Sequence, residues 1–136
     1  MEPLSSCRIG GCPHRRVRAF ADRLGYDYAW EVEHHFLEEY SHSSAPEVFL
    51  GAASQRTKRI RLGHGVVQLT TNQPHRVAER VATLDLLSGG RVDLGMGEAA
   101  GPAELHPFGI RVRDKVANTE VTRSVEFEKL SEEAGS

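Results

Sequence analysis

Hydrophobic positions follow two different periods along the chain. Helical spacing and short continuous apolar runs alternate over six segments, in the order 13–24, 26–32, 46–56, 60–69, 74–88 and 91–96. The first pattern is typical of an amphipathic helix and the second of a strand with one or both faces covered. Because each crossover is long enough to return the chain to the same edge, successive strands are expected to run parallel. The sequence therefore predicts an α/β domain with a parallel sheet.

Glycine, proline and serine mark the expected ends of the helices. Gly25 follows the first helix as a left-handed cap. Pro46 fits the first turn of the second helix, and Ser43 or Ser44 is expected to cap its amino end. Glu47 then lies close to the positive end of that helix, where a carboxylate is favourable.

Glycines also punctuate the second and third strands. Gly63 and Gly65 lie inside the run 60–69, where an interior glycine often marks a bulge or the close approach of a ligand to the backbone. The sequence GMGEAAG at 95–101 lacks both the lysine of a phosphate-binding loop and the full dinucleotide fingerprint. By itself it predicts only a connection, with Pro102, after the third strand.

Length and composition describe an ordinary globular chain. It has 136 residues, of which 39% are hydrophobic and 26% are charged, and its formal net charge is −2. These values favour one domain or part of one. The weak negative charge gives no electrostatic reason to expect nucleic acid or an anionic membrane as a partner.

Cysteine usage and apolar content bear on the compartment. Cys7 and Cys12 have no second Cys or His pair at zinc-finger spacing, so free thiols are expected. No apolar run approaches the roughly 18 residues of a membrane span, and the amino terminus lacks the apolar region of a secretory signal. We therefore expect a cytoplasmic protein.

The principal candidate for chemistry is the sequence Glu33-His34-His35, directly after the apolar run 26–32. Many parallel α/β folds place their active sites at the carboxyl ends of strands. Imidazole titrates near neutral pH and a neighbouring carboxylate can hold one tautomer, so this group can act as an acid or a base. In a regular strand the two rings would point to opposite faces, and only one would readily face a site unless the strand has already ended.

Two other interpretations of these histidines stay open at this point. Either ring can be a structural histidine whose nitrogens are satisfied by the backbone. Alternatively, Glu33, His34, His35 and His42 can supply ligands to a metal, as in a small metal-dependent hydrolase. Their spacing is not diagnostic and a helical His-Glu-x-x-His arrangement is absent, so no metal ligand is assigned.

Several ordered motifs resemble one protein family. The sequence resembles the amino-terminal half of the bacterial luciferase-like flavin-dependent monooxygenases over about residues 19 to 115, in GYDYAWEVEHHF, RIRLGHGVVQL, RVAERVATLDLLSGGRVDLGMGE and ELHPFG. The resemblance implies the first part of a (β/α)8 TIM barrel, a fold that usually needs roughly 250 residues. We expect an irregular segment over 1–12, the partial barrel over 13–115 and a divergent helix or tail over 116–136.

The resemblance also implies an activity and a site. It implies reduced FMN, or a deazaflavin, at the carboxyl ends of the strands, with O2 oxidising a small organic substrate and a separate reductase supplying the reduced flavin. His34 matches the acid-base histidine of the family. Gly65 and Val66 match a cis peptide beneath the flavin, and Gly97 and Glu98 match the strand end beside its polar edge.

A different class of function is also consistent with the sequence. The remaining four strand-helix units of such a barrel do not follow residue 115. An open half barrel has unpaired strand edges and an exposed apolar face. The alternative expectation is a truncated, noncatalytic α/β fragment or interaction module, which cannot bind flavin alone and pairs with itself or with another chain.

Overall fold

The computed structural model describes residues 13–37, 41–98 and 101–120. Within these ranges the strands β1 (Tyr28–Glu31), β2 (Arg61–Gln68) and β3 (Val92–Gly97) form one parallel sheet in the order β1-β2-β3. The helices α1 (Pro13–Leu24), α2 (Pro46–Ser54) and α3 (Pro74–Ser88) precede the three strands in turn. The alternation of helices with parallel strands confirms the predicted α/β class.

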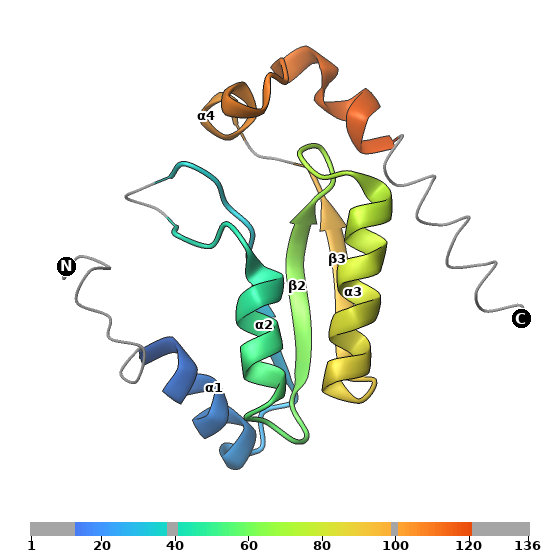
Figure 1. The fold of residues 1–136 in the computed structure, drawn as a ribbon. Coiled ribbons are helices and arrows are strands. Elements are labelled where there is room, and N and C mark those ends of the chain that lie inside the picture. The colour runs from blue at the N-terminus through green and yellow to red at the C-terminus, as the bar shows by residue number, and fades with distance from the viewer. Residues whose placement is uncertain (1–12, 38–40, 99–100, 121–136) are drawn as a thin grey trace, which may run out of the picture.

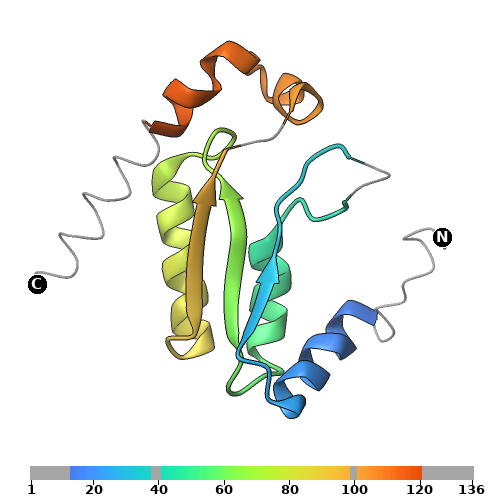
Figure 2. The ribbon, with the colours of Figure 1, turned by 180° about the vertical axis from the view of Figure 1, so that it is seen from behind.

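The sheet has one covered face and one bare face. Helices α2 and α3 lie side by side over the first face (Figure 1), whereas no helix of the described residues lies over the opposite face (Figure 2). The short helix α4 (Pro102–Leu105) and the 3₁₀ turns His106–Phe108 and Val112–Asp114 lie beyond the carboxyl ends of the strands. This arrangement leaves the carboxyl edge of the sheet beneath the segment that follows β3.

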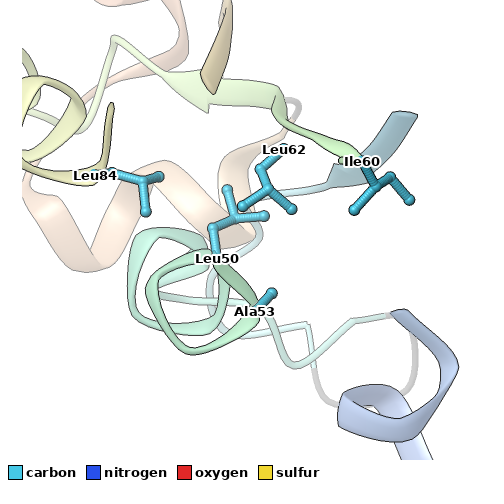
Figure 3. Close-up of a cluster of buried hydrophobic side chains, with 5 residues drawn as sticks. All are labelled: Leu50, Ala53, Ile60, Leu62 and Leu84. Carbon is cyan, nitrogen blue, oxygen red and sulfur yellow. The ribbon is translucent and has the colours of Figure 1, made fainter. Parts of the chain in front are cut away.

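The hydrophobic core lies between the sheet and its two covering helices. Leu50 and Ala53 of α2 face Leu62 of β2, with Ile60 and Leu84 beside them (Figure 3). All five side chains are buried. A second cluster lies nearer the carboxyl edge and consists of Val67, Leu69 and Val77, with Val81, Leu94 and Met96 packed against it. Burial of these aliphatic side chains fixes which face of each strand turns toward the helices.

Helix boundaries follow the glycine and proline signals better than the serine signal. Gly25 has φ 86° after α1, and α2 begins at Pro46 as predicted. The prediction of a serine cap was wrong, because α2 is preceded by Ala45 and has no side-chain cap. The hydroxyl of Ser43 instead donates to Glu31 Oε1 at 3.0 Å, a bond across to the end of β1.

The glycines of the second and third strands have structural roles. The pairing of β2 with β3 shifts register between His64 and Val67, which confirms the predicted bulge, and the Gly65–Val66 peptide is cis, as the resemblance implies. Gly95 lies in β3, within the predicted strand 91–96, whereas placing Gly97 in the connection after the strand was wrong, because Gly97 is the last residue of β3. A Cβ at Gly95 would overlap the carbonyl oxygen of His64, so only glycine permits this approach of the two backbones.

Some of the expectations lie outside the described residues. These are the irregular segment 1–12 with its two cysteines and the tail beyond residue 120. Residues 115–120 are helical. None of the helices in the described ranges has the length and apolar content that a bilayer crossing requires.

Candidate functional site

The predicted histidine pair lies in a loop at the carboxyl end of β1. The strand ends at Glu31, and the backbone N–H of His34 donates to the carbonyl of Ser43 at 2.8 Å. Phe36 adopts a left-handed conformation with φ 59°, which turns the chain sharply after His35. Because the strand has ended, neither ring is confined to one face of the sheet, and each histidine contacts a different carboxylate.

His35 pairs with the carboxylate two positions before it. Its Nε2 lies 2.8 Å from Glu33 Oε1, and the Glu33 residue is only 7% exposed. The same carboxylate accepts hydrogen bonds from the backbone N–H of Gln68 at 2.9 Å and from the amide of Asn72 at 2.9 Å. Glu33 therefore fastens the loop after β1 to the end of β2.

His34 pairs with a carboxylate from helix α4. Its Nδ1 lies 3.1 Å from Oε1 of Glu104, a residue of α4 that is 1% exposed. The same oxygen accepts from the His35 backbone N–H at 3.1 Å and from the Gln68 side-chain amide at 2.8 Å. Burial alone would raise the pKa of Glu104, but the hydrogen bonds from Gln68, the His35 amide and His34 outweigh it, so this pKa lies below its ordinary value.

One amide group joins the two pairs. Nε2 of Gln68 donates to the backbone carbonyl of Glu33 and to the carboxylate of Glu104, both at 2.8 Å. Gln68 is 2% exposed and is the last residue of β2. The loop after β1, the end of β2 and helix α4 therefore meet at a single buried side chain.

Aromatic contacts bring the segment after α4 over the same loop. The ring of Phe108 meets His35 edge-on at 5.0 Å between centroids and Phe36 at 5.8 Å. Aromatic pairs in such tilted arrangements add attraction beyond the area they bury. The motif ELHPFG thus supplies both a carboxylate and a ring to the histidine pair.

The remaining predicted site residues lie on the bare face of the sheet or at its edge. Side chains alternate along β2 and β3, so Gly63, Gly65, Gly95 and Gly97 face away from the covering helices. We call these four glycines the glycine surface. A Cβ at Gly63 would overlap the ring of Trp30, and a Cβ at Gly97 would lie 2.6 Å from Val66 Cγ2. Glycine at these two positions therefore makes room for the Trp30 ring and the Val66 side chain on this face.

Glu98 follows β3 directly and is more exposed than the buried carboxylates. It forms an ion pair with Lys115, whose Nζ lies 3.1 Å from Glu98 Oε2. His34 thus lies in the loop after β1, Gly65 and Val66 lie in the second half of β2, and Gly97 ends β3 directly before Glu98.

The metal hypothesis finds no ligand set in the described part of the chain. Across those residues no three His, Cys, Asp or Glu side chains group closely enough to hold a metal ion. Glu33 and His35 bond to each other, whereas His42 is exposed. His64 is buried at 2% exposure on the helix-covered side of β2, where burial lowers the pKa of its imidazole.

The residues that sequence reasoning missed are Glu104 and Gln68. Glu104 lies 70 residues from the histidine it contacts, and no local pattern links the two. Its only sequence signal is its place in the motif ELHPFG, which belongs to the resemblance. Gln68 lies in the predicted strand 60–69, and nothing in that pattern distinguishes it from its neighbours.

Comparison with known proteins places most of this chain in a single family. The family model described as luciferase-like monooxygenase matches residues 13–126. Among characterised relatives, 4-hydroxyprotoasukamycin monooxygenase of Streptomyces nodosus subsp. asukaensis is 44% identical over 93 residues, which are 68% of this chain and 25% of the relative. The chain therefore spans about a quarter of the length of that relative.

Solved structures resemble the described fold over most of this chain and about a third or less of their own length. Monooxygenase RslO1 from Streptomyces bottropensis matches with a TM-score of 0.78 and 36% identity, covering 82% of this chain and 34% of that one. A TM-score of 0.78 is also found for the oxygenating constituent of 3,6-diketocamphane monooxygenase from Pseudomonas putida, in complex with FMN. The match covers 83% of this chain and 32% of that one, and at 24% identity it shows the fold alone. The coenzyme F420-dependent tetrahydromethanopterin reductase from Methanopyrus kandleri matches at 0.55 with 31% identity, covering 73% of this chain and 26% of that one. These likenesses confirm that the three strands and their helices form part of a TIM barrel.

Proposed function

This chain belongs to the luciferase-like monooxygenase family, and on that premise we propose that it carries part of a flavin-dependent oxidoreductase site with His34 as the acid-base residue. In this proposal residues 13–115 are the barrel segment and the following residues a separate tail. The observation that carries the proposal is the contact of His34 with the buried carboxylate of Glu104, at the carboxyl end of a parallel sheet. Active sites of such barrels lie at that end.

The residues on the bare face fit a flat cofactor. Only glycine occurs at the four positions of the glycine surface, and a Cβ at three of them would meet Trp30, the His64 carbonyl or Val66 closely. Gly65 and Gly97 add no side chain of their own beside Val66, and glycine in a strand often marks a close approach of another group to the backbone. We propose that these residues and Glu98 hold reduced FMN, with a deazaflavin as the alternative; the FMN and F420 proteins with similar folds support this choice.

The chemistry assigned to the protein is proton transfer and positioning. Reduced flavin, when bound, would supply electrons to O2, and the oxygen would then oxidise an organic substrate. His34 takes up or gives a proton at Nε2 while its Nδ1 donates to Glu104. Phe108 and Phe36 pack against each other beside the loop that carries His34.

The other components of the reaction follow from the family premise. We propose a small, mostly apolar organic substrate, as the names limonene 1,2-monooxygenase and 4-hydroxyprotoasukamycin monooxygenase suggest for two relatives. The reduced flavin comes from a separate reductase, because the sequence has no nicotinamide fingerprint. The proposed compartment is the cytoplasm.

Replacing each histidine in turn tests the assignment of His34. Oxygen consumption is followed with reduced FMN and a panel of apolar substrates, for the wild-type chain, His34→Gln and the matched control His35→Gln. Loss of a general acid-base residue typically costs about 100-fold to 10,000-fold in rate. We expect that loss for His34→Gln alone, with the circular dichroism spectrum unchanged. Equal turnover by His34→Gln and the wild-type chain would remove His34 from the mechanism.

A further inference from the structure

We propose that Glu104 is a positioning residue, which fixes the orientation and the tautomer of His34 so that Nε2 is its proton-accepting nitrogen. The inference rests on the proposed acid-base function of His34 and adds the group that prepares its ring. It concerns only residues within the described part of the chain.

The geometry of the contact determines which atom carries the proton. An ionised carboxylate only accepts hydrogen bonds. Oε1 of Glu104 lies 3.1 Å from Nδ1 of His34, so Nδ1 is the donor. In a neutral imidazole the second nitrogen then holds the lone pair. Glu104 thereby makes Nε2 the basic atom of His34.

The surroundings of Glu104 keep it ionised. The residue is 1% exposed, which by itself disfavours a charge, but three N–H groups converge on one of its oxygens. These donors are the His34 ring, the His35 backbone and the Gln68 amide, and together they hold the pKa of Glu104 below its ordinary value. A neutral Glu104 would have a hydroxyl, which is able to donate to His34 and reverse its tautomer.

The adjacent pair provides an internal contrast. His35 contacts its carboxylate Glu33 through Nε2 at 2.8 Å, whereas His34 contacts Glu104 through Nδ1. Two neighbouring imidazoles are therefore held in opposite tautomers by two carboxylates. A purely structural role of Glu104, as acceptor for the His35 amide and Gln68, would not require any particular tautomer of His34.

Nitrogen NMR of the histidine side chains reads the tautomers directly. The experiment uses the full chain with 15N-labelled histidine at about pH 8.5, two units above the ordinary imidazole pKa. The protonated and the unprotonated ring nitrogens have well-separated shifts, so each neutral ring reports its tautomer. We expect the Nδ1–H form for His34 and the Nε2–H form for His35. A wild-type His34 in the Nε2–H form overturns the proposal without any variant being needed.

Three variants separate positioning from folding. Glu104→Ala removes the acceptor and is expected to bring His34 predominantly to the Nε2–H form, whereas Glu104→Gln keeps a carbonyl oxygen and retains the Nδ1–H form. Glu79→Ala, which removes an exposed carboxylate, is the control and is expected to leave the tautomers of both His34 and His35 unchanged. An unchanged His34 tautomer in folded Glu104→Ala contradicts the proposal. If Glu104→Ala does not fold, the wild-type and Glu104→Gln spectra decide: loss of the Nδ1–H form in Glu104→Gln counts against it.

Turnover gives a second readout. Removing a residue that orients a catalytic histidine lowers the rate at saturation, so Glu104→Ala is expected to lower kcat by about 10-fold to 100-fold with little change in KM. The NMR measurement contains no flavin and no substrate. A chain that fails to bind reduced FMN would therefore contradict the proposed function while the tautomer of His34 is still determined.

Discussion

The two histidine–carboxylate pairs differ in how the chain brings them together. Glu33 and His35 are two positions apart, and their pair forms within one loop. His34 and Glu104 are 70 positions apart, and their pair forms only when α4 lies over the carboxyl edge of the sheet. The first pair forms between residues of one loop. The second pair requires that the loop after β1, the end of β2 and helix α4 have come together.

The pairs also differ in what they are connected to. Asn72, which donates to Glu33, accepts from Arg80 Nη2 at 2.6 Å, and Nη1 of Arg80 donates to Glu47 at 2.8 Å. The local pair therefore continues through hydrogen bonds into α3 and α2. Glu104 gathers donors from the loop and from Gln68 instead. We therefore expect Glu33 to act mainly in the framework of the fold, whereas the role that we propose for Glu104 is to position His34.

The largest expected effect on folding is that of Glu33→Ala. It leaves the His35 ring, the Gln68 backbone N–H and the Asn72 amide without their shared acceptor at a buried position. We expect the free energy of unfolding to fall by about 3 kcal/mol, since buried donors to a charged acceptor each contribute substantially. Urea denaturation measures this change. The control Glu79→Ala removes an exposed carboxylate and should cost less than about 0.5 kcal/mol; similar losses for the two variants would refute the framework role.

The second largest expected effect is a pH dependence of the free energy of unfolding, which comes from Glu104. Its folded-state pKa is depressed, so its contribution is fully present above the unfolded value of about 4.3 and is lost as pH falls through the folded value. We expect the free energy of unfolding of the wild type to exceed that of Glu104→Gln by about 2 kcal/mol at pH 7, and by less at pH 4. Urea unfolding of both proteins at pH 7, 5 and 4 measures it. A difference that stays constant or grows toward pH 4 would show that the charge of Glu104 does not stabilise the fold.

A smaller effect concerns the side chain that connects the pairs. Gln68→Met keeps most of the buried volume but removes the amide that donates to the Glu33 carbonyl and to Glu104. In a double-mutant cycle with Glu104→Gln we expect a coupling of about 1 kcal/mol, since residues in one hydrogen-bond network are not additive. Unfolding free energies of the four proteins give this value. The same cycle with the exposed Glu79→Gln serves as control. Equal coupling free energies in the two cycles would mean that Gln68 does not connect the pairs.

Local signals were sufficient for the end of α1 and for the starts of α2 and α3. Gly25, Pro46 and Pro74 act on the backbone of their own neighbourhood, so the starts and ends they predicted agree with the structure. Ser43 was misassigned as a cap because its hydroxyl bonds to Glu31, twelve positions away. A side chain with both a local and a distant partner available cannot be assigned from spacing alone.

The site was predictable only in its local half. The carboxylate and imidazoles at 33 to 35 stand out because they follow a hydrophobic strand, and the resemblance supplied the cis peptide at Gly65–Val66. Glu104 carries no comparable signal, because its importance depends on α4 meeting a loop that precedes it by 70 residues. Likewise, Gly97 was placed in a connection, whereas it ends β3 beside the Val66 side chain.

Titration of the chain with reduced FMN under anaerobic conditions tests whether His34 stands at a flavin site, as we propose. The measurement follows the side-chain nitrogen resonances of 15N-labelled histidine as flavin is added. We expect the His34 resonances to shift progressively and to saturate, while those of the exposed His42 and His75 do not move. An unchanged His34 resonance at flavin concentrations that saturate the chain, or no saturable binding at all, would contradict this proposal.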